Sequence, residues 1–242
     1  MLPFATIHDG TYGRTDDRLA SYSSKGPTVL DHVVKPDIVG PSNYEVSVIA
    51  PGSTLLSENR GNVVLGTDGQ PDYFKLSGTS MATPIVSGAI ALMLQQSSSL
   101  TPDQIKARLM KTAYKTFLTS SVATDPTTGQ TYTSYYDLFT VGAGYLDLVA
   151  AFNNSDLAPA TVGSALSPTA TYNAKNRTVS LSNGNSSVAR SSVVWGSSVV
   201  WGTSSNNVFS VVWGTSTNAT SVVWGASVSQ GDAAFVTPIG EN

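Results

Sequence analysis

The sequence predicts an α/β fold over residues 1–155, followed by a small β-rich repeat region over residues 156–242. Two observations predict this division. Before residue 155, short β-prone runs are followed by long apolar helical segments. After it, charged residues are scarce, and the chain consists largely of Ser, Thr, Asn and Val and contains all four Trp. We place the boundary in the polar, turn-forming cluster at residues 153–156.

Short β-prone runs in the first part lie mostly between Gly and Pro residues, so we expect them to be strands. These runs are residues 19–23, 36–39, 45–50 and 73–76. Apolar and polar residues alternate incompletely within them. This pattern is typical of a sheet that is covered on both faces.

The longest helix candidate covers residues 80–96. Its apolar residues lie around almost the whole circumference, and they are Met81, Ala82, Ile85, Val86, Ala89, Ile90, Leu92, Met93 and Leu94. A helix that is apolar all round is expected to be buried.

Two further helices are predicted from their start signals and spacing. Thr101 is a cap residue followed by a Pro and, three residues after the cap, by Gln104. We expect this helix to run to about Lys115, with Lys106, Arg108 and Lys111 facing water. The other begins after the Gly-Ala-Gly at 142–144 and carries Leu146, Val149 and Phe152 at helical spacing.

The second part contains an internal repeat, after two expected strands on either side of a turn at residues 173–176. Val-Val-Trp-Gly recurs at 193–196, 199–202, 211–214 and 222–225. Val-Val-Trp favours strands, and Gly followed by Ser or Thr favours turns. Three interpretations stay open: Trp and Val packing across strands, Trp stacking on a polymer such as a carbohydrate, and a Ser/Thr-rich tail without a fixed fold.

Composition excludes several classes of function. The 242 residues are 40% hydrophobic with a net charge of −3, which argues against a disordered chain and against an electrostatic binder of nucleic acid. Without Cys there is no disulfide, thiolate zinc site or Cys nucleophile. No run is long enough for a membrane span, and the first residues lack the pattern of a signal peptide.

The residues at 76–84 carry the chemistry. A strand ends, Gly78 permits a tight turn, and Ser80 falls in the first turn of the long helix. Unpaired backbone N–H groups and the positive end of the helix dipole therefore converge near the Ser80 hydroxyl. An acyl-transfer enzyme needs this arrangement, although an isolated Ser before a helix is more often only a cap.

The residues around Ser80 distinguish a catalytic serine from a simple helix cap. Gly-Thr-Ser-Met-Ala-Thr-Pro at 78–84 resembles the nucleophile motif of the subtilisin-like serine peptidases, the subtilases. Further segments match the second half of that family in the same order: 20–27, 35–38, 50–52, the Thr101-Pro102 helix start and 142–147. The α/β-hydrolase elbow is excluded, because it needs Gly where this chain has Ala82.

The resemblance implies a partial subtilisin-like fold, a parallel sheet flanked by helices, and a serine endopeptidase acting through an acyl-enzyme at Ser80. It makes Ser80 the nucleophile and its N–H an oxyanion donor, with the Thr79 hydroxyl as an oxyanion helper. The substrate is then a protein or peptide, and the location extracellular. Calcium is compatible with the family, but no acidic cluster here has ligand spacing, so we expect no cofactor.

The family's Asp, His and oxyanion Asn precede the segment that matches 18–27. Only seventeen residues precede Arg18, so we expect those three groups outside this chain, in a missing N-terminal half present in cis or in trans. His8 and His32 are expected to be loop residues. This chain alone is then expected to be inactive. The alternative is a non-catalytic remnant whose repeat tail binds a surface or polymer.

Overall fold

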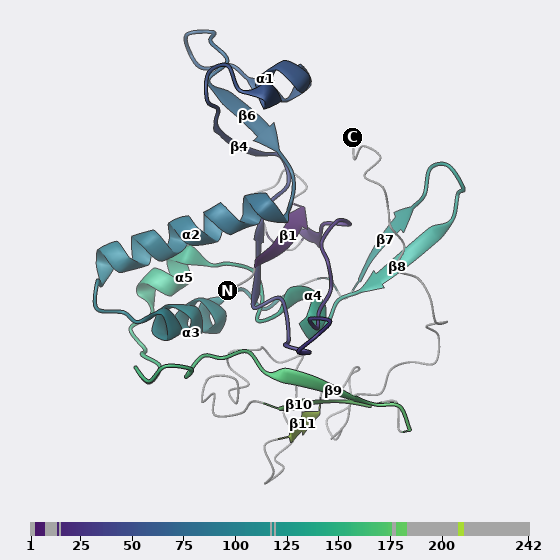
Figure 1. The fold of residues 1–242 in the computed structure, drawn as a ribbon, viewed down its shortest axis with the longest axis vertical. Coiled ribbons are helices and arrows are strands. Elements are labelled where there is room, and N and C mark those ends of the chain that lie inside the picture. The colour runs from purple at the N-terminus through teal and green to yellow at the C-terminus, as the bar shows by residue number, and fades with distance from the viewer. Residues whose placement is uncertain are drawn as a thin grey trace.

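A computed structural model describes residues 3–7, 14, 16–116, 118, 120–175, 178–182 and 208–210. The Val-Val-Trp-Gly repeats and His8 lie outside these residues. Figure 1 shows the elements, which follow in the order β1 (Pro3–Ile7), β2 (Arg18–Leu19), β3 (Ile38–Pro41), β4 (Glu45–Val48), α1 (Thr54–Glu58), η1 (Arg60–Asn62), β5 (Val63–Val64), β6 (Tyr73–Leu76), α2 (Thr79–Gln96), α3 (Pro102–Thr112), β7 (Ser120–Thr124), β8 (Thr131–Tyr135), α4 (Leu138–Val141), α5 (Leu148–Asn153), β9 (Thr169–Asn173), β10 (Thr178–Ser182) and β11 (Val208–Ser210).

A parallel strand pair lies at the centre of the fold. Strands β1 and β3 run parallel, and β2 pairs antiparallel with the other edge of β1. Helix α2 packs against β1 and β3. Ile38 and Val39 in β3 are fully buried, which agrees with a covered sheet. The α/β class and the partial arrangement of parallel strands with a helix across them are thus confirmed.

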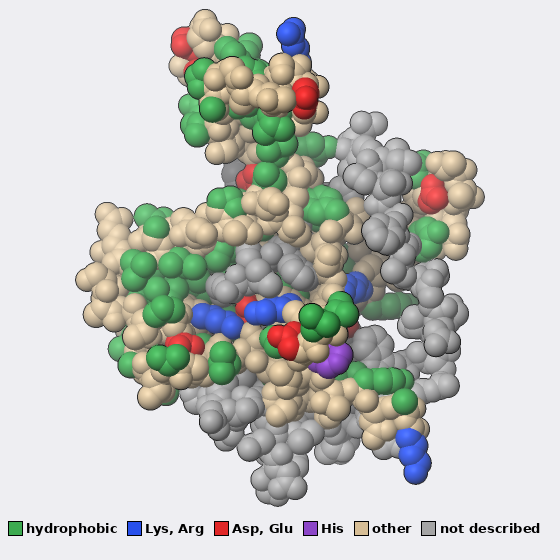
Figure 2. All heavy atoms as spheres, in the orientation of Figure 1, with side chains coloured by type: hydrophobic (Ala, Val, Ile, Leu, Met, Phe, Trp, Pro, Cys, Tyr) green, Lys and Arg blue, Asp and Glu red, His purple; other side chains and the backbone are tan. Residues whose placement is uncertain are grey.

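Helix α2 buries one stripe of its surface rather than its whole circumference. Its buried residues recur at helical spacing, at Ala82, Val86, Ala89 and Met93. Leu92 is 44% exposed and Leu94 is 37% exposed, so the prediction of a helix buried all round is wrong. Helix α2 contacts β1, β3 and α5. Figure 2 shows hydrophobic side chains together on the face over α2.

Helix α3 begins where its cap signals predict. The Gln104 N–H donates to Thr101 Oγ1 at 3.3 Å, and the Thr101 N–H donates to Gln104 Oε1 at 3.0 Å. The helix ends at Thr112, before the expected Lys115, because Ala113 takes an extended backbone conformation. This reciprocal pair satisfies two N–H groups that would otherwise lack partners at the helix start.

Replacing Thr101 with alanine should remove one of these bonds and lower the free energy of unfolding by about 1 kcal/mol. Thr101→Ser retains the hydroxyl and should leave stability nearly unchanged. Urea unfolding of both variants measures the difference. Equal stability of the alanine and serine variants would show that the cap contributes nothing here.

The chain beyond residue 155 crosses α3 and is bonded to it. The backbone N–H groups of Gly163 and Ala165 donate to the Asp103 carboxylate at 3.0 and 2.9 Å. The Gln104 side-chain amide donates to the Ala158 carbonyl at 3.0 Å. Contacts therefore cross the expected boundary, and the division at 155 stays a prediction.

The expected pair of strands around the turn at 173–176 is confirmed as β9 and β10. They pair antiparallel, and β11 pairs with the other edge of β10. Ala170, Val179 and Leu181 of this sheet join the hydrophobic core formed by the first part. The beginning of the second region thus shares its core with the α/β part.

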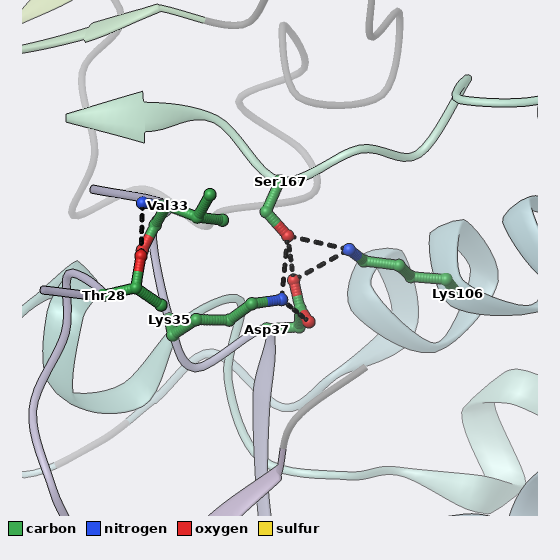
Figure 3. A network of polar contacts seen from close by, with 6 residues as sticks. All are labelled: Thr28, Val33, Lys35, Asp37, Lys106 and Ser167. Atoms are coloured by element: carbon green, nitrogen blue, oxygen red, sulfur yellow. Dashed lines mark hydrogen bonds and ion pairs between the residues drawn. The ribbon is translucent and has the colours of Figure 1, made fainter. Parts of the chain in front are cut away.

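A buried ionic network links β3, α3 and the crossing segment (Figure 3). Asp37 is fully buried, and its carboxylate contacts Lys35 Nζ at 2.6 Å and Lys106 Nζ at 2.9 Å. Ser167 donates to the same carboxylate and accepts from Lys106 at 2.8 Å. The expectation that Lys106 faces water is therefore wrong, and Arg108, 7% exposed, is buried as well. Chain from beyond residue 155 covers this side of α3.

Two β-structures extend away from this body (Figure 1). One is the three-stranded sheet β4–β6–β5, and the other is the β7–β8 hairpin. In α5, which forms in the region expected, Val149 is 71% exposed and Ala151 provides the buried contact instead. Among the described helices, none has the length and hydropathy needed to cross a membrane.

Candidate active site

Ser80 is the second residue of α2 and is exposed. Strand β6 ends at Leu76, and residues 77 and 78 connect it to the helix. The first N–H groups of a helix have no carbonyl partner within it, and the positive end of its dipole lies at the same place. The Ser80 hydroxyl thus sits where a developing negative charge is stabilised.

The turn before Ser80 is fixed by the segment after β3. The Gly78 N–H donates to the carbonyl of Ser42 at 3.0 Å. The Tyr44 N–H donates to Ser77 Oγ at 2.9 Å. Ser42 is fully buried, so the turn is attached to a buried part of the structure. Sequence reasoning missed Ser42 and Tyr44; the polar residues directly after the buried strand β3 were the available signal.

Gly78 adopts a backbone conformation that only glycine tolerates well. Its φ is 152° and its ψ is 159°, in a region that residues with a Cβ avoid. A Cβ built on Gly78 would meet Met81 Sδ at 3.5 Å, which is ordinary contact. The requirement for glycine is therefore conformational rather than a matter of space.

Gly78→Ala should accordingly lower the free energy of unfolding by about 1–3 kcal/mol, through backbone strain alone. Gly88 provides the matched control, since it lies inside α2 and an added Cβ would meet no described atom within 4 Å beyond the neighbouring backbone of the helix. Gly88→Ala should raise stability by about 0.5–1 kcal/mol. Chemical denaturation measures both, and a neutral Gly78→Ala would contradict the assignment of strain.

In the first turn of α2, a backbone carbonyl is left without the hydrogen bond that a regular helix would give it. Pro84 has no N–H, so it cannot donate to the Ser80 carbonyl as other residues would at that position. Thr83 Oγ1 donates to the Thr79 carbonyl at 3.1 Å. Within the part of the chain that the structure describes, neither the Ser80 nor the Thr79 hydroxyl has a hydrogen-bond partner.

No described imidazole or carboxylate is hydrogen-bonded to the Ser80 hydroxyl. His32 is exposed in the loop before β3, and its carbonyl accepts from the Ala170 N–H at 2.7 Å. Ser80 follows the turn attached to Ser42, beyond the opposite end of β3. His32 is thus the loop residue that the sequence predicts, and the same prediction for His8 falls outside the described residues.

Within the described ranges, no three His, Cys, Asp or Glu side chains come together as a metal site. The expectation that the chain uses no cofactor stays a prediction.

A family model describing the subtilase family matches residues 10–144, more than half of the chain. The chain belongs to the subtilase family. The match includes the β6–α2 connection and Ser80. Subtilases are serine peptidases.

Individual relatives agree with this membership. The serine protease AprX of Bacillus subtilis is 43% identical over 101 residues, covering 42% of this chain and 22% of AprX. The subtilisin-like protease SBT4.10 of Arabidopsis thaliana is 31% identical over 160 residues, covering 62% of this chain and 20% of that protein. The chain therefore matches about a fifth of the length of these subtilases.

Solved structures give weaker similarity. Fervidolysin from Fervidobacterium pennivorans, a keratinolytic enzyme related to subtilisin, superimposes with a TM-score of 0.42 at 23% identity, over 65% of this chain and 19% of that one. The serine protease of Aeromonas sobria gives 0.42 at 22% identity, over 64% of this chain and 30% of that one.

Proposed function

We propose that this chain supplies the nucleophile of a serine endopeptidase, with Ser80 forming an acyl-enzyme with a protein substrate. The observation that carries the proposal is the position of Ser80: exposed, at the second residue of α2, directly after the glycine-specific turn. Its hydroxyl has no hydrogen-bond partner among the described residues, so it is accessible to a substrate carbonyl.

The chemistry follows from this position. Ser80 Oγ bonds to the scissile carbonyl carbon and gives its proton to a base, and the peptide C–N bond breaks as the amine leaves with that proton. Water then attacks the ester, releases the acid and restores the Ser80 hydroxyl. The Ser80 N–H and the Thr79 hydroxyl are the proposed donors to the oxyanion.

The base, the Asp that orients it and the oxyanion Asn are proposed to come from a further segment of the catalytic domain, in cis or in trans. The exposed side of α2 supports this. Leu92 and Leu94, which flank the buried Met93 on either side, are too exposed for a fully covered helix, so α2 can receive another layer of the domain (Figure 2). The chain alone is then inactive.

An active-site label tests this proposal. The chain is treated with a fluorescent organophosphonate alone, and again after joining to the N-terminal part of the AprX catalytic domain. We expect labelling at Ser80 only in the second case. Robust labelling and peptide hydrolysis by the chain alone, both lost in Ser80→Ala, would overturn the proposed dependence on a second segment.

We also propose an extracellular location, on the basis of the family and of the low-charge, Ser- and Thr-rich second region. Antibody detection in the culture medium rather than in cell lysate is the expected result. Retention of all the protein inside cells would contradict it.

A further inference from the structure

The sheet that precedes Ser80 carries a cavity of its own. Residues 45–76, here called the arm, contain β4, α1, η1, β5 and β6 and project beyond the N-terminal end of α2 (Figure 1). The cavity has a volume of about 470 Å³. Four apolar residues, Val46, Val64, Leu65 and Tyr73, and two acidic ones, Asp68 and Asp72, contribute to its lining.

The apolar part of this lining is exposed rather than packed. Val46 is 52% exposed, Leu65 61% and Tyr73 39%, whereas Phe74 on the opposite face of β6 is 4% exposed. Val64 lies directly opposite Tyr73 in the ladder, so the two side chains share one face. The arm thus has its own packed side and a second apolar side open to a ligand.

Acidic groups form one edge of the cavity. Gly66 lies beneath them: a Cβ on it would come within 2.2 Å of Asp72 Oδ2 and 3.0 Å of Asp68 Oδ1. Both carboxylates therefore lie next to the backbone of Gly66, in the space that a side chain would occupy. The ammonium group of Lys75 is held 4.9 Å from the centre of the Tyr44 ring, nearer the base of the arm. Since the arm contains four carboxylates and two cationic side chains, a basic ligand is favoured.

The cavity lies within reach of a peptide bound at Ser80. Ser80 lies seven positions after Tyr73, a span of at most about 25 Å for extended chain. Strand β4 pairs with β6 along one edge, and no other described strand pairs with its outer edge. An open edge of this kind can accept an extended peptide through main-chain hydrogen bonds.

We propose that the arm is a secondary binding site for the polypeptide substrate. An apolar side chain of the substrate packs on the apolar lining of the cavity, and an adjacent Lys or Arg contacts Asp68 and Asp72. This inference rests on the proposed function, because it treats the bound peptide as substrate. The pairing of an apolar cavity with an acidic edge is the charge and shape complementarity that selects such a sequence.

Peptide binding tests the site without chemistry. The full chain carrying Ser80→Ala is titrated with fluorescent eight-residue peptides that contain Leu-Lys, Leu-Glu or Ser-Lys at the centre, and anisotropy is measured. We expect the Leu-Lys peptide to bind at least tenfold more tightly than either other peptide. Its affinity should decrease as salt rises, because the cation and the carboxylates are exposed.

Variants of the arm assign the binding to the cavity. We expect the affinity for the Leu-Lys peptide to fall at least tenfold in two variants. One combines Asp68→Asn with Asp72→Asn, and the other is Leu65→Ser. Glu58→Gln is the matched control, since Glu58 is an exposed carboxylate of the same arm outside the described lining. Circular dichroism checks that each variant is folded, and Gly66→Ala, which displaces the Asp72 carboxylate, provides a second test of the acidic edge.

Several outcomes would overturn the proposal: no binding of the Leu-Lys peptide, equal binding of all three peptides, or no effect of the arm variants. Sedimentation that showed a dimer lost on Leu65→Ser would instead make the arm a self-association surface. The two proposals fail separately. Absence of organophosphonate labelling at Ser80 in the joined enzyme would contradict only the proposal that Ser80 is the nucleophile. The binding assay is independent of that result, because it uses the Ser80→Ala chain, which has no hydroxyl at residue 80.

Discussion

Ser80→Ala should reduce turnover by the joined catalytic domain about a millionfold, to a residual set by substrate binding and the oxyanion donors. Alanine retains the N–H of residue 80 and the helix start, so the loss isolates the hydroxyl. Because Ser80 is exposed and unpaired among the described residues, the substitution should leave stability nearly unchanged. Hydrolysis of a chromogenic peptide and organophosphonate labelling measure the two effects.

Ser87→Ala is the control for this experiment. Ser87 lies on the exposed side of the same helix, and its hydroxyl donates to the Thr83 carbonyl at 3.0 Å. Ser87→Ala likewise removes a serine hydroxyl, but outside the first turn of α2, so the variant enzyme should keep full activity. Turnover by Ser80→Ala within tenfold of the parent enzyme would exclude Ser80 as the nucleophile.

Asp37→Asn should have the largest effect on stability, lowering the free energy of unfolding by about 3–5 kcal/mol. The substitution removes the negative charge between Lys35 and Lys106, whose side chains are only 16% and 17% exposed. Two cations then remain in a poorly solvated position without compensation. Urea unfolding at pH 7 measures the loss, and a change below about 1 kcal/mol would contradict it.

The same network predicts a dependence on pH. Burial by itself would raise the pKa of Asp37, but Lys106 and Lys35 outweigh it and lower the pKa from 3.8 to about 2. The folded state therefore holds this proton less tightly than the unfolded state. The stabilisation is complete above about pH 5 and is lost as the pH falls through about 2, by about 2 kcal/mol. This part of the pH dependence should vanish in Asp37→Asn.

Asp156→Asn is the matched control for the buried carboxylate. Asp156 pairs with Lys111, but their side chains are 63% and 36% exposed. Exposed ion pairs contribute little because water screens them, so this substitution should leave the free energy of unfolding nearly unchanged.

Local signals were sufficient for the elements that position Ser80. Strand β6 matches the predicted residues 73–76, and α2 begins one residue before the predicted start. The cap of α3 was predicted because both of its hydrogen bonds join residues three positions apart. In these places the chemistry of a short stretch determines the conformation.

Contacts between distant residues could not be predicted in this way. Lys106 was assigned to the solvent side of its helix because its partner, Asp37, lies 69 residues earlier. The bonds from Ser42 and Tyr44 to the turn before Ser80 likewise join segments that only the folded chain brings together. Strand β1 was missed for a related reason, since pairing with β3 rather than its own pattern defines it.

The crossing of α3 by the chain after residue 155 has a consequence for cooperative unfolding. Asp103 fixes two backbone N–H groups of that segment, Ser167 joins the ionic network, and Leu181 is fully buried in the shared core. Separating α3 from residues 156–182 would break all of these at once. We therefore expect α3, β9 and β10 to exchange their amide protons together with the buried core, so that a shortened chain ending at 155 would lose part of that core.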